Sequence, residues 1–350
     1  MIERYFHRWE QQLADVSQSD RKVRPFEWGL DWIDGWRAEA SASASDPRAT
    51  VSAWVDQVMR DTDAFFTPKP TNDYVLDDGV LTFPTGFPTP HPENNVVRAR
   101  YFPADPMLKR GLKPSLSNPR KAVVVLAQWN SDSEGHVGLC KILSKLGIAS
   151  LRLSLPYHDR RMPPELTRAD YIVSSNIVRT VQVCRQAVMD VRLALWWLRD
   201  QGYDRLGLLG TSLGSCLSLL TACHEPLVQA QALNHVSPFF SDVVWRGLST
   251  EHVQKGLEGH VDADELRALW RPISPWSYLE RVRGKHTLLV YAKYDLTFPV
   301  DLSIKLIEEF RQRGIAIDVR RLPCGHYSTG VAPFKYLDGW YLGKFLATRL

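Results

Sequence analysis

The chain has 350 residues, which is long for one simple domain but suits a single large α/β unit with extensions. Hydrophobic residues make up 44% and charged residues 23%, close to the average for globular proteins, so a large core is possible. The 43 Lys and Arg residues exceed the 39 Asp and Glu residues by four, an excess too small to indicate binding to nucleic acid or to an acidic membrane.

The sequence also lacks the marks of secreted and membrane-spanning proteins. The five cysteines are odd in number and scattered, which predicts reduced thiols rather than a disulfide framework or a zinc site. The first twenty residues are charged and lack the apolar run of a signal peptide, and no stretch approaches the roughly 18 apolar residues of a membrane span. We therefore expect a cytoplasmic protein that needs no metal or organic cofactor. The sequence predicts no particular oligomeric state.

Residues 1–74 are interpreted as a helical N-terminal extension. Trp28, Trp32 and Trp36 recur at four-residue spacing, so a helix through them would carry all three on one face. We interpret this stripe as packing onto the main domain, and an apolar lip over the active site is the alternative.

From about residue 79 the pattern changes to strands alternating with helices. Val80–Phe83 and Asn95–Phe102 are predicted to be antiparallel edge strands. The elements predicted after them are strand 122–127, helix 136–146, strand 148–155, helix 172–200, strand 205–210, a helix from 213, strand 230–236, strand 287–292, helix 302–313, strand 315–322 and helix 333–348. Residues 239–280 interrupt the alternation with helical pieces and are interpreted as a cap insertion. The alternation predicts a mostly parallel, doubly wound sheet, with ligands bound beyond the carboxyl ends of its strands.

The segment Gly210-Thr211-Ser212-Leu213-Gly214 lies between a predicted strand and a predicted helix. In that setting a G-x-S-x-G motif indicates a serine nucleophile on a tight, strained turn. The turn requires small residues two positions before and after Ser212, and both are glycine. The positive end of the following helix points at the serine, and the backbone N–H of Leu213 is the first candidate donor to an oxyanion.

A serine hydroxyl needs a base to remove its proton and a third group to orient that base. In this architecture the expected chain order is Ser, acid, His. Asp295 follows a buried-type strand 83 residues after Ser212, and His326 follows the last predicted strand 31 residues later. Asp242, which follows an earlier strand, is the rival acid.

With the strained turn at Ser212 followed by Asp295 and His326, residues 75–350 resemble the α/β-hydrolase superfamily. The loop Pro156–Arg161 and the long helix after it resemble an α/β-hydrolase-domain branch akin to dienelactone-hydrolase and acyl-peptidase-like members. The resemblance implies an α/β-hydrolase fold in which Ser212 is the nucleophile, His326 the general base and then acid, and Asp295 the orienting carboxylate.

The residues after the third strand depart from the family pattern. Many members carry a His-Gly stretch there, whose backbone supplies the second oxyanion donor, whereas this chain has Gln128-Trp129-Asn130. Any residue except proline can supply a backbone N–H, so the oxyanion hole can still form. We favour Trp129 as this donor, with Gln128 as the alternative.

Two predicted strand ends supply candidates for the substrate pocket. Tyr157, His158 and Arg160 follow one strand, and Phe239 and Phe240 follow another. An arginine there would suit a carboxylate or phosphate, and a solvated loop is the alternative. The aromatic residues favour a small-molecule substrate with an apolar or aromatic acyl group.

These features predict a serine hydrolase that cleaves a carboxylic ester, or a thioester or amide, through an acyl-enzyme intermediate. Two other functions stay open. The chain could be a non-catalytic binding or scaffold protein that keeps the fold, or an acyltransferase that uses the same triad.

Overall fold

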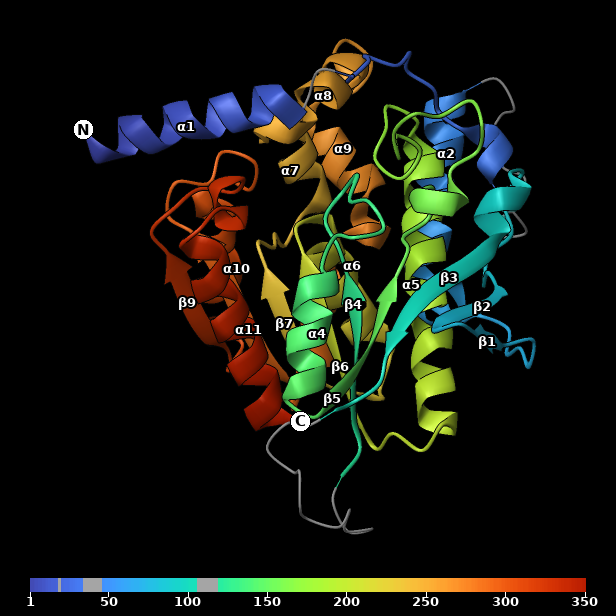
Figure 1. Cartoon of the computed structure of the whole chain (residues 1–350). Coiled ribbons are helices and arrows are strands. Elements are labelled where there is room, and N and C mark those ends of the chain that lie inside the picture. Colours follow the sequence, from blue (N-terminus) through green and yellow to red (C-terminus); the bar gives the residue numbers. More distant parts are fainter. Residues whose placement is uncertain (18–19, 34–45, 106–118) are drawn as a thin grey trace, which may run out of the picture.

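The computed structural model describes residues 1–17, 20–33, 46–105 and 119–350. A twisted sheet with helices on both faces forms its centre (Figure 1). The strands are β1 (Val75–Asp77), β2 (Val80–Pro84), β3 (Val96–Phe102), β4 (Lys121–Leu126), β5 (Ile148–Leu153), β6 (Arg205–Thr211), β7 (Val228–Asn234), β8 (His286–Ala292) and β9 (Asp318–Leu322). They lie in the order β1-β2-β3-β5-β4-β6-β7-β8-β9.

Strands β4 to β9 are parallel, and β1, β2 and β3 continue the sheet antiparallel beyond β5. The predicted mostly parallel sheet is thus confirmed, as is the antiparallel pairing of β2 with β3. The short β1 was not predicted. Its three residues are all exposed, so they show no alternation of buried and exposed positions.

Helices surround the sheet and fill most of its connections. The α-helices are α1 (Ile2–Ser17), α2 (Pro47–Arg60), α3 (Thr62–Phe66), α4 (Val137–Lys145), α5 (Ile177–Asp200), α6 (Leu213–His224), α7 (Phe240–Arg246), α8 (Glu251–Leu257), α9 (Ala263–Leu269), α10 (Val300–Gln312) and α11 (Phe334–Arg349). The 3₁₀ helices are η1 (Leu30–Trp32), η2 (Pro92–Asn95), η4 (Asp159–Arg161), η5 (Leu248–Thr250), η6 (Arg271–Ile273), η7 (Pro275–Val282) and η8 (Ser328–Gly330). Among the described residues, no helix is both long and apolar enough to span a membrane.

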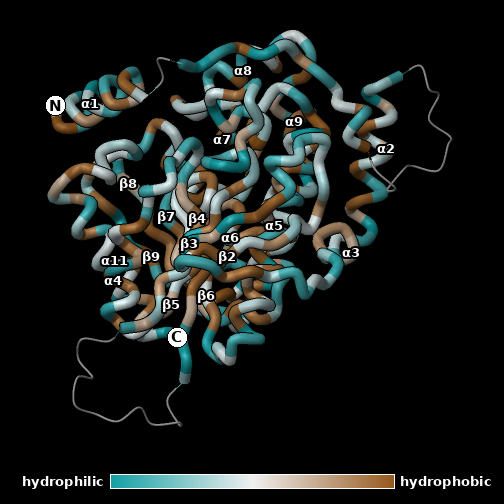
Figure 2. The backbone as a smooth tube through the Cα atoms, turned by 45° about the vertical axis from the view of Figure 1, so that its right-hand side comes forward, coloured by the Kyte–Doolittle hydropathy of each residue, from teal (hydrophilic) through white to brown (hydrophobic). Residues whose placement is uncertain are grey.

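The two faces of the sheet bury two separate cores. In β4, Val123 and Val125 pack with side chains of α4 and α11, whereas Val124 and Leu126 pack with those of α5, α6 and α10. The alternation follows from the two-residue period of a strand, and burial on both faces explains the continuous apolar run of β4. Figure 2 shows the hydrophobic residues concentrated in this interior.

The segment around Trp28 differs from the predicted helix. Residues 21–29 form neither a helix nor a strand apart from a single β-bridge at Glu27, and Trp32 ends the 3₁₀ turn η1. The backbone carbonyls of Glu27 and Trp28 accept hydrogen bonds from Ile177 and Val178, whose N–H groups have no partner within the first turn of α5. The prediction of one helix through the tryptophans was therefore wrong, and Trp36 lies outside the described residues.

Candidate active site

The serine motif forms the turn between β6 and α6. Ser212 has φ 57° and ψ −120°, a strained conformation for a residue with a side chain. A Cβ atom at Gly210 would overlap the carbonyl oxygen of Gly214, and one at Gly214 would overlap that of Leu126. The expectation that both positions must be small is thus confirmed. The N–H of Ser212 donates to the carbonyl oxygen of Asn234 at 2.8 Å, which ties the turn to the end of β7.

The loops after β8 and β9 bring an acid and a histidine together. His326 Nδ1 donates to Asp295 Oδ2 at 3.1 Å. The other carboxylate oxygen of Asp295 accepts from the N–H groups of Thr297 and Phe298, at 2.8 and 2.7 Å. The carboxylate is therefore fixed from both sides, and its bond to Nδ1 leaves His326 Nε2 free to act as a base.

The surroundings of this pair shift the pKa of both groups. Burial disfavours the charge on His326, but the charge and hydrogen bond of Asp295 outweigh burial and raise the pKa of the imidazole. Burial would likewise raise the pKa of Asp295, and the neighbouring histidines hold it below its ordinary value instead. A base with a raised pKa that faces an ionised carboxylate is the arrangement that general base catalysis needs.

A second histidine lies beside the same carboxylate. His235 follows β7 and is 1% exposed, with Nδ1 2.9 Å from Asp295 Oδ2 and its ring centre 4.5 Å from that of His326. Burial and the neighbouring His326 lower the pKa of His235, which keeps its ring neutral. The sequence prediction missed His235 because it placed this residue inside the strand 230–236. The signal available was its place at the carboxyl end of a parallel strand.

The three side chains also raise the question of a metal. Within the described residues, one group of three or more His, Cys, Asp or Glu side chains has its ligand atoms within 4.8 Å of one another. It consists of His235, Asp295 and His326. The Nδ1 atom of His326 is already used in its hydrogen bond to Asp295. We therefore interpret the group as a hydrogen-bonded acid and base, and the expectation that no metal is needed stays a prediction.

The residues predicted to donate to an oxyanion, Leu213, Trp129 and Gln128, line the same cavity as Ser212. Leu213 begins α6 directly after the serine. Across the cavity, Ser131 N–H donates to the Gln128 carbonyl at 3.1 Å, and Asn130 has φ 59°, so residues 128–131 form a turn with Trp129 at its second position. Among the described residues, no hydrogen bond occupies the N–H of Leu213, Gln128 or Trp129.

His158 holds this turn in place. Its Nε2 accepts from the Asn130 N–H at 3.0 Å, and its Nδ1 lies 2.9 Å from the Pro156 carbonyl oxygen. Burial lowers the pKa of His158 to about 4, so the ring is neutral and Nε2 keeps the lone pair that accepts the bond. The indole of Trp129 donates to the Ala169 carbonyl at 2.9 Å and fixes the turn from its other side.

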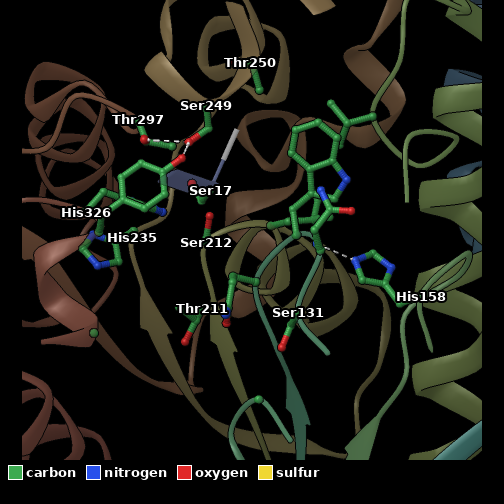
Figure 3. A pocket seen from close by; sticks show the side chains of 18 of the residues that line it. Ser17, Ser131, His158, Thr211, Ser212, His235, Ser249, Thr250, Thr297 and His326 are labelled. Atoms are coloured by element: carbon green, nitrogen blue, oxygen red, sulfur yellow. Dashed lines mark hydrogen bonds between the residues drawn. The ribbon is translucent and has the colours of Figure 1, made fainter. Parts of the chain in front are cut away.

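These groups line one cavity of about 780 Å³. In Figure 3, Ser212 lies between His326 on one side and His158 on the other. Predicted site residues that line the cavity are Gln128, Trp129, His158, Ser212, Leu213, Phe240 and His326. Apolar side chains from the segment between β7 and β8, including Val243 and Val244, form part of its wall.

Three of the predicted pocket residues do not line this cavity within the described part of the chain. Tyr157 is completely buried and its hydroxyl lies 3.0 Å from His91 Nδ1, so it is a core residue. Arg160 is exposed on the surface. Phe239 stacks on Trp276 with ring centres 4.9 Å apart, outside the cavity. Each follows a strand as expected, but the loop turns its side chain elsewhere.

Asp242 and the neighbouring cysteines have other roles. Both carboxylate oxygens of Asp242 accept from Arg267 on α9, at 2.9 Å each, so this acid is paired away from His326. Cys216 lines the cavity, but burial raises the pKa of its thiol to about 12. A thiol of that pKa is a poor nucleophile near neutral pH.

The cavity also contains ionisable groups that the sequence did not point to. Asp338 on α11 accepts from Asn234 Nδ2 at 2.8 Å, and burial raises its pKa to about 7 despite that bond. Arg21 and Arg168 also line the cavity, where Arg21 donates to the Tyr327 hydroxyl and Arg168 to Asp20. Nothing in the local sequence pattern marks these three residues.

The family model described as "Alpha/beta hydrolase domain containing 18" matches residues 118–270, which is less than half of the chain and includes Ser212 but neither Asp295 nor His326. No curated protein matches the chain.

Solved structures share the fold. The acylaminoacyl peptidase of Pyrococcus horikoshii is 13% identical with a TM-score of 0.60, over 81% of this chain and 42% of its own. An esterase of Pyrococcus furiosus is 15% identical with a TM-score of 0.53, over 81% and 97%. Acetyl xylan esterase 1 from Thermoanaerobacterium is 14% identical with a TM-score of 0.55, over 81% and 93%. At such identities the likeness concerns the fold. The sheet, the strained turn at Ser212 and these comparisons show that the chain has the α/β-hydrolase fold, and its residues 118–270 resemble an α/β-hydrolase family.

Proposed function

We propose that the chain is a serine hydrolase that cleaves a carboxylic ester through an acyl-enzyme intermediate. The observation that carries the proposal is the hydrogen-bonded pair of His326 and Asp295, whose imidazole lines the same cavity as the strained Ser212. Each of these residues follows a parallel strand, as the chemistry of this superfamily requires.

In the proposed mechanism His326 Nε2 takes the proton of the Ser212 hydroxyl as its oxygen attacks the ester carbonyl. Asp295 holds the proton on Nδ1 and stabilises the imidazolium that forms. The N–H groups of Leu213 and Trp129 stabilise the negative oxygen of the tetrahedral intermediate, with Gln128 as the alternative second donor. His326 then protonates the leaving alcohol, and a water activated in the same way releases the acid.

The lining of the cavity supports an apolar or aromatic acyl group as substrate. Phe240, Val243 and Val244 come from the segment between β7 and β8, and Phe298 comes from the loop after β8. We propose that residues 239–280 are a cap on a hydrolase domain of residues 75–350, and that residues 1–74 are a helical extension of it. Proteins of this fold in other organisms include the esterases and the peptidase named above, so a thioester or an amide is a close variant.

Labelling with a fluorophosphonate probe, together with turnover of p-nitrophenyl acetate, tests the proposal. Wild-type protein should react, and Ser212→Ala should lose labelling and at least about 10³-fold of the turnover. Ser133→Ala is the control because it makes the same change at an exposed serine, and it should behave as wild type.

Labelling of Ser212→Ala at the wild-type level would refute the assignment of the nucleophile. A wild-type protein that neither labels nor turns over would instead favour a binding or scaffold protein. Transfer of the acyl group to an added alcohol in preference to water would identify an acyltransferase.

A further inference from the structure

The N-terminal helix α1 lies across the loops that carry Asp295 and His326 (Figure 1). Phe6 stacks on Tyr294, with ring centres 4.6 Å apart and planes 8° from parallel. Tyr294 directly precedes Asp295, and its N–H donates to the carbonyl oxygen of Cys324 in the histidine loop at 2.9 Å. Phe6 also contacts Phe334 at the start of α11. The helix thus touches the acid loop and the element that follows the histidine loop.

Glu10 connects α1 directly to the residues after His326. Its Oε2 accepts from the Tyr327 N–H at 2.7 Å, and its Oε1 accepts from the Ser328 N–H at 2.9 Å and the Ser328 hydroxyl at 2.6 Å. The side chain is 0% exposed, whereas most of α1 is exposed. A buried carboxylate is costly unless it accepts several hydrogen bonds, and this one accepts three.

The histidine loop is shaped around this carboxylate. A Cβ atom at Gly325 would overlap the carboxyl group of Glu10, so only glycine allows the approach. The hydroxyl of Ser328 bonds to Glu10 and also accepts from the Gly325 N–H at 2.8 Å. The residues on both sides of His326 are therefore fixed to a side chain more than 300 positions earlier in the chain.

We propose that Glu10 is a positioning residue for His326, and that α1 completes the active site by holding the histidine loop against Asp295. The catalytic consequence rests on the proposed hydrolase function, but the coupling between Glu10 and His326 does not. Without Glu10, two backbone N–H groups next to His326 would lose their acceptors, and the loop would no longer be held in one position.

Glu10 also adds a charge to the surroundings of His326. The ionisable side chains beside the imidazole are Asp295 after β8, His235 after β7 and Tyr327 in the histidine loop, and the charge of Glu10 on α1 acts on it as well. The two carboxylates raise the pKa of His326 against the effect of burial, with Asp295 the stronger. A Glu10→Gln variant removes one charge and turns one acceptor oxygen into an amide NH₂ group. The pKa of His326 should therefore fall.

The experiment compares wild type with Glu10→Gln, Ser328→Ala and the control Glu3→Gln, which changes an exposed glutamate of the same helix. Two readouts are measured on protein that is folded by circular dichroism. The first is the pH dependence of kcat and KM for p-nitrophenyl acetate. The second is the pKa of His326 by NMR, with His326→Asn used to assign its signal, and this readout does not need turnover.

For Glu10→Gln we expect kcat to fall about 10- to 100-fold with little change in KM, as for displacement of a catalytic group. The acid limb of the pH profile and the NMR pKa of His326 should both move to lower pH. Ser328→Ala removes one of the three hydrogen bonds to Glu10 and the acceptor of the Gly325 N–H, but it keeps the charge, so it should lower kcat less and leave the pKa nearly unchanged. It also supplies the test if Glu10→Gln fails to fold. Glu3→Gln should match wild type.

Wild-type kcat and wild-type His326 pKa in folded Glu10→Gln would overturn the proposal and leave the hydrolase function standing. If Glu10→Gln does not fold, wild-type kcat in Ser328→Ala would overturn it. An inactive wild type combined with a lowered His326 pKa in Glu10→Gln would overturn the hydrolase function and leave the coupling standing.

Discussion

The buried carboxyl group of Asp338 should make the stability of the protein depend on pH. Burial raises its pKa to about 7, whereas the unfolded chain has the ordinary value of 3.8. Between these values the native state keeps a proton that the unfolded chain has released. The free energy of unfolding therefore falls as the pH rises from about 4 to about 7, and this contribution is constant above that range.

The size of the effect follows from the two pKa values. One pKa unit corresponds to about 1.36 kcal/mol, so ionisation of Asp338 costs the native state about 4 kcal/mol at pH 8. Asp338→Asn cannot ionise, and its amide oxygen can still accept from Asn234. In wild type, Asp338 Oδ1 has no hydrogen-bond partner. The variant places an NH₂ group there, and burying it without an acceptor destabilises the native state by about 1–3 kcal/mol. We expect it to be about 1–3 kcal/mol more stable than wild type at pH 8 and less stable below pH 4.

Urea unfolding, followed by tryptophan fluorescence at several pH values between 4 and 8.5, measures this difference. Asp77→Asn, which changes an exposed aspartate in β1, is the control and should follow wild type. A difference between Asp338→Asn and wild type that stays constant over the whole pH range would refute the reasoning, because it would mean that Asp338 is ionised throughout.

Two further predictions concern the turn at the serine and the turn opposite it. Replacing His158 by Phe removes the acceptor for the Asn130 N–H, so the neighbouring N–H of Trp129 should move. The kcat for p-nitrophenyl acetate should then fall about 10- to 100-fold. An unchanged kcat would mean that His158 does not hold an oxyanion donor at Trp129. Gly214→Ala should destabilise the protein by about 1–3 kcal/mol and abolish probe labelling, because its Cβ would overlap the Leu126 carbonyl. Gly138→Ala on α4 meets no atom within 4 Å and should instead stabilise by up to about 1 kcal/mol in the same urea assay.

The sequence predicted the parts of the fold that follow from local pattern. The apolar run 122–127 identified β4 because a strand buried on both faces needs no polar position. The two glycines around Ser212 identified the tight turn between β6 and α6. A Cβ at Gly210 would overlap Gly214 within the motif, and a Cβ at Gly214 would overlap Leu126 at the end of the neighbouring strand β4. The roles given to Asp295 and His326 depended on chain order and stay predictions until the variants are measured.

Contacts between distant segments had no such local signal. Glu10 is one of several charged residues on α1, and its burial depends on a loop more than 300 residues later. Tyr157 and Arg160 follow a strand, but the direction of their side chains depends on a loop in which Tyr157 and Asp159 have positive φ. Trp28 and Trp32 have the four-residue spacing of a helix face. The backbone carbonyl of Trp28 nevertheless accepts a hydrogen bond from Val178 in the first turn of α5.

Two buried acids, Asp295 and Asp338, show why residue type and burial alone do not assign a role. Burial would raise the pKa of Asp295, but the charge of His326 and the hydrogen bonds of His235 and His326 outweigh burial and lower it, which favours the ionised form. Asp338 accepts one hydrogen bond from a neutral amide, so burial prevails and its pKa rises to about 7. An ionised carboxylate in contact with the imidazole stabilises an imidazolium, so Asp295, which is bonded to His326, fits that role, whereas Asp338 is bonded to Asn234 and is only partly ionised near neutral pH. The number and charge of the donors around each acid, which the folded chain alone determines, separate the two.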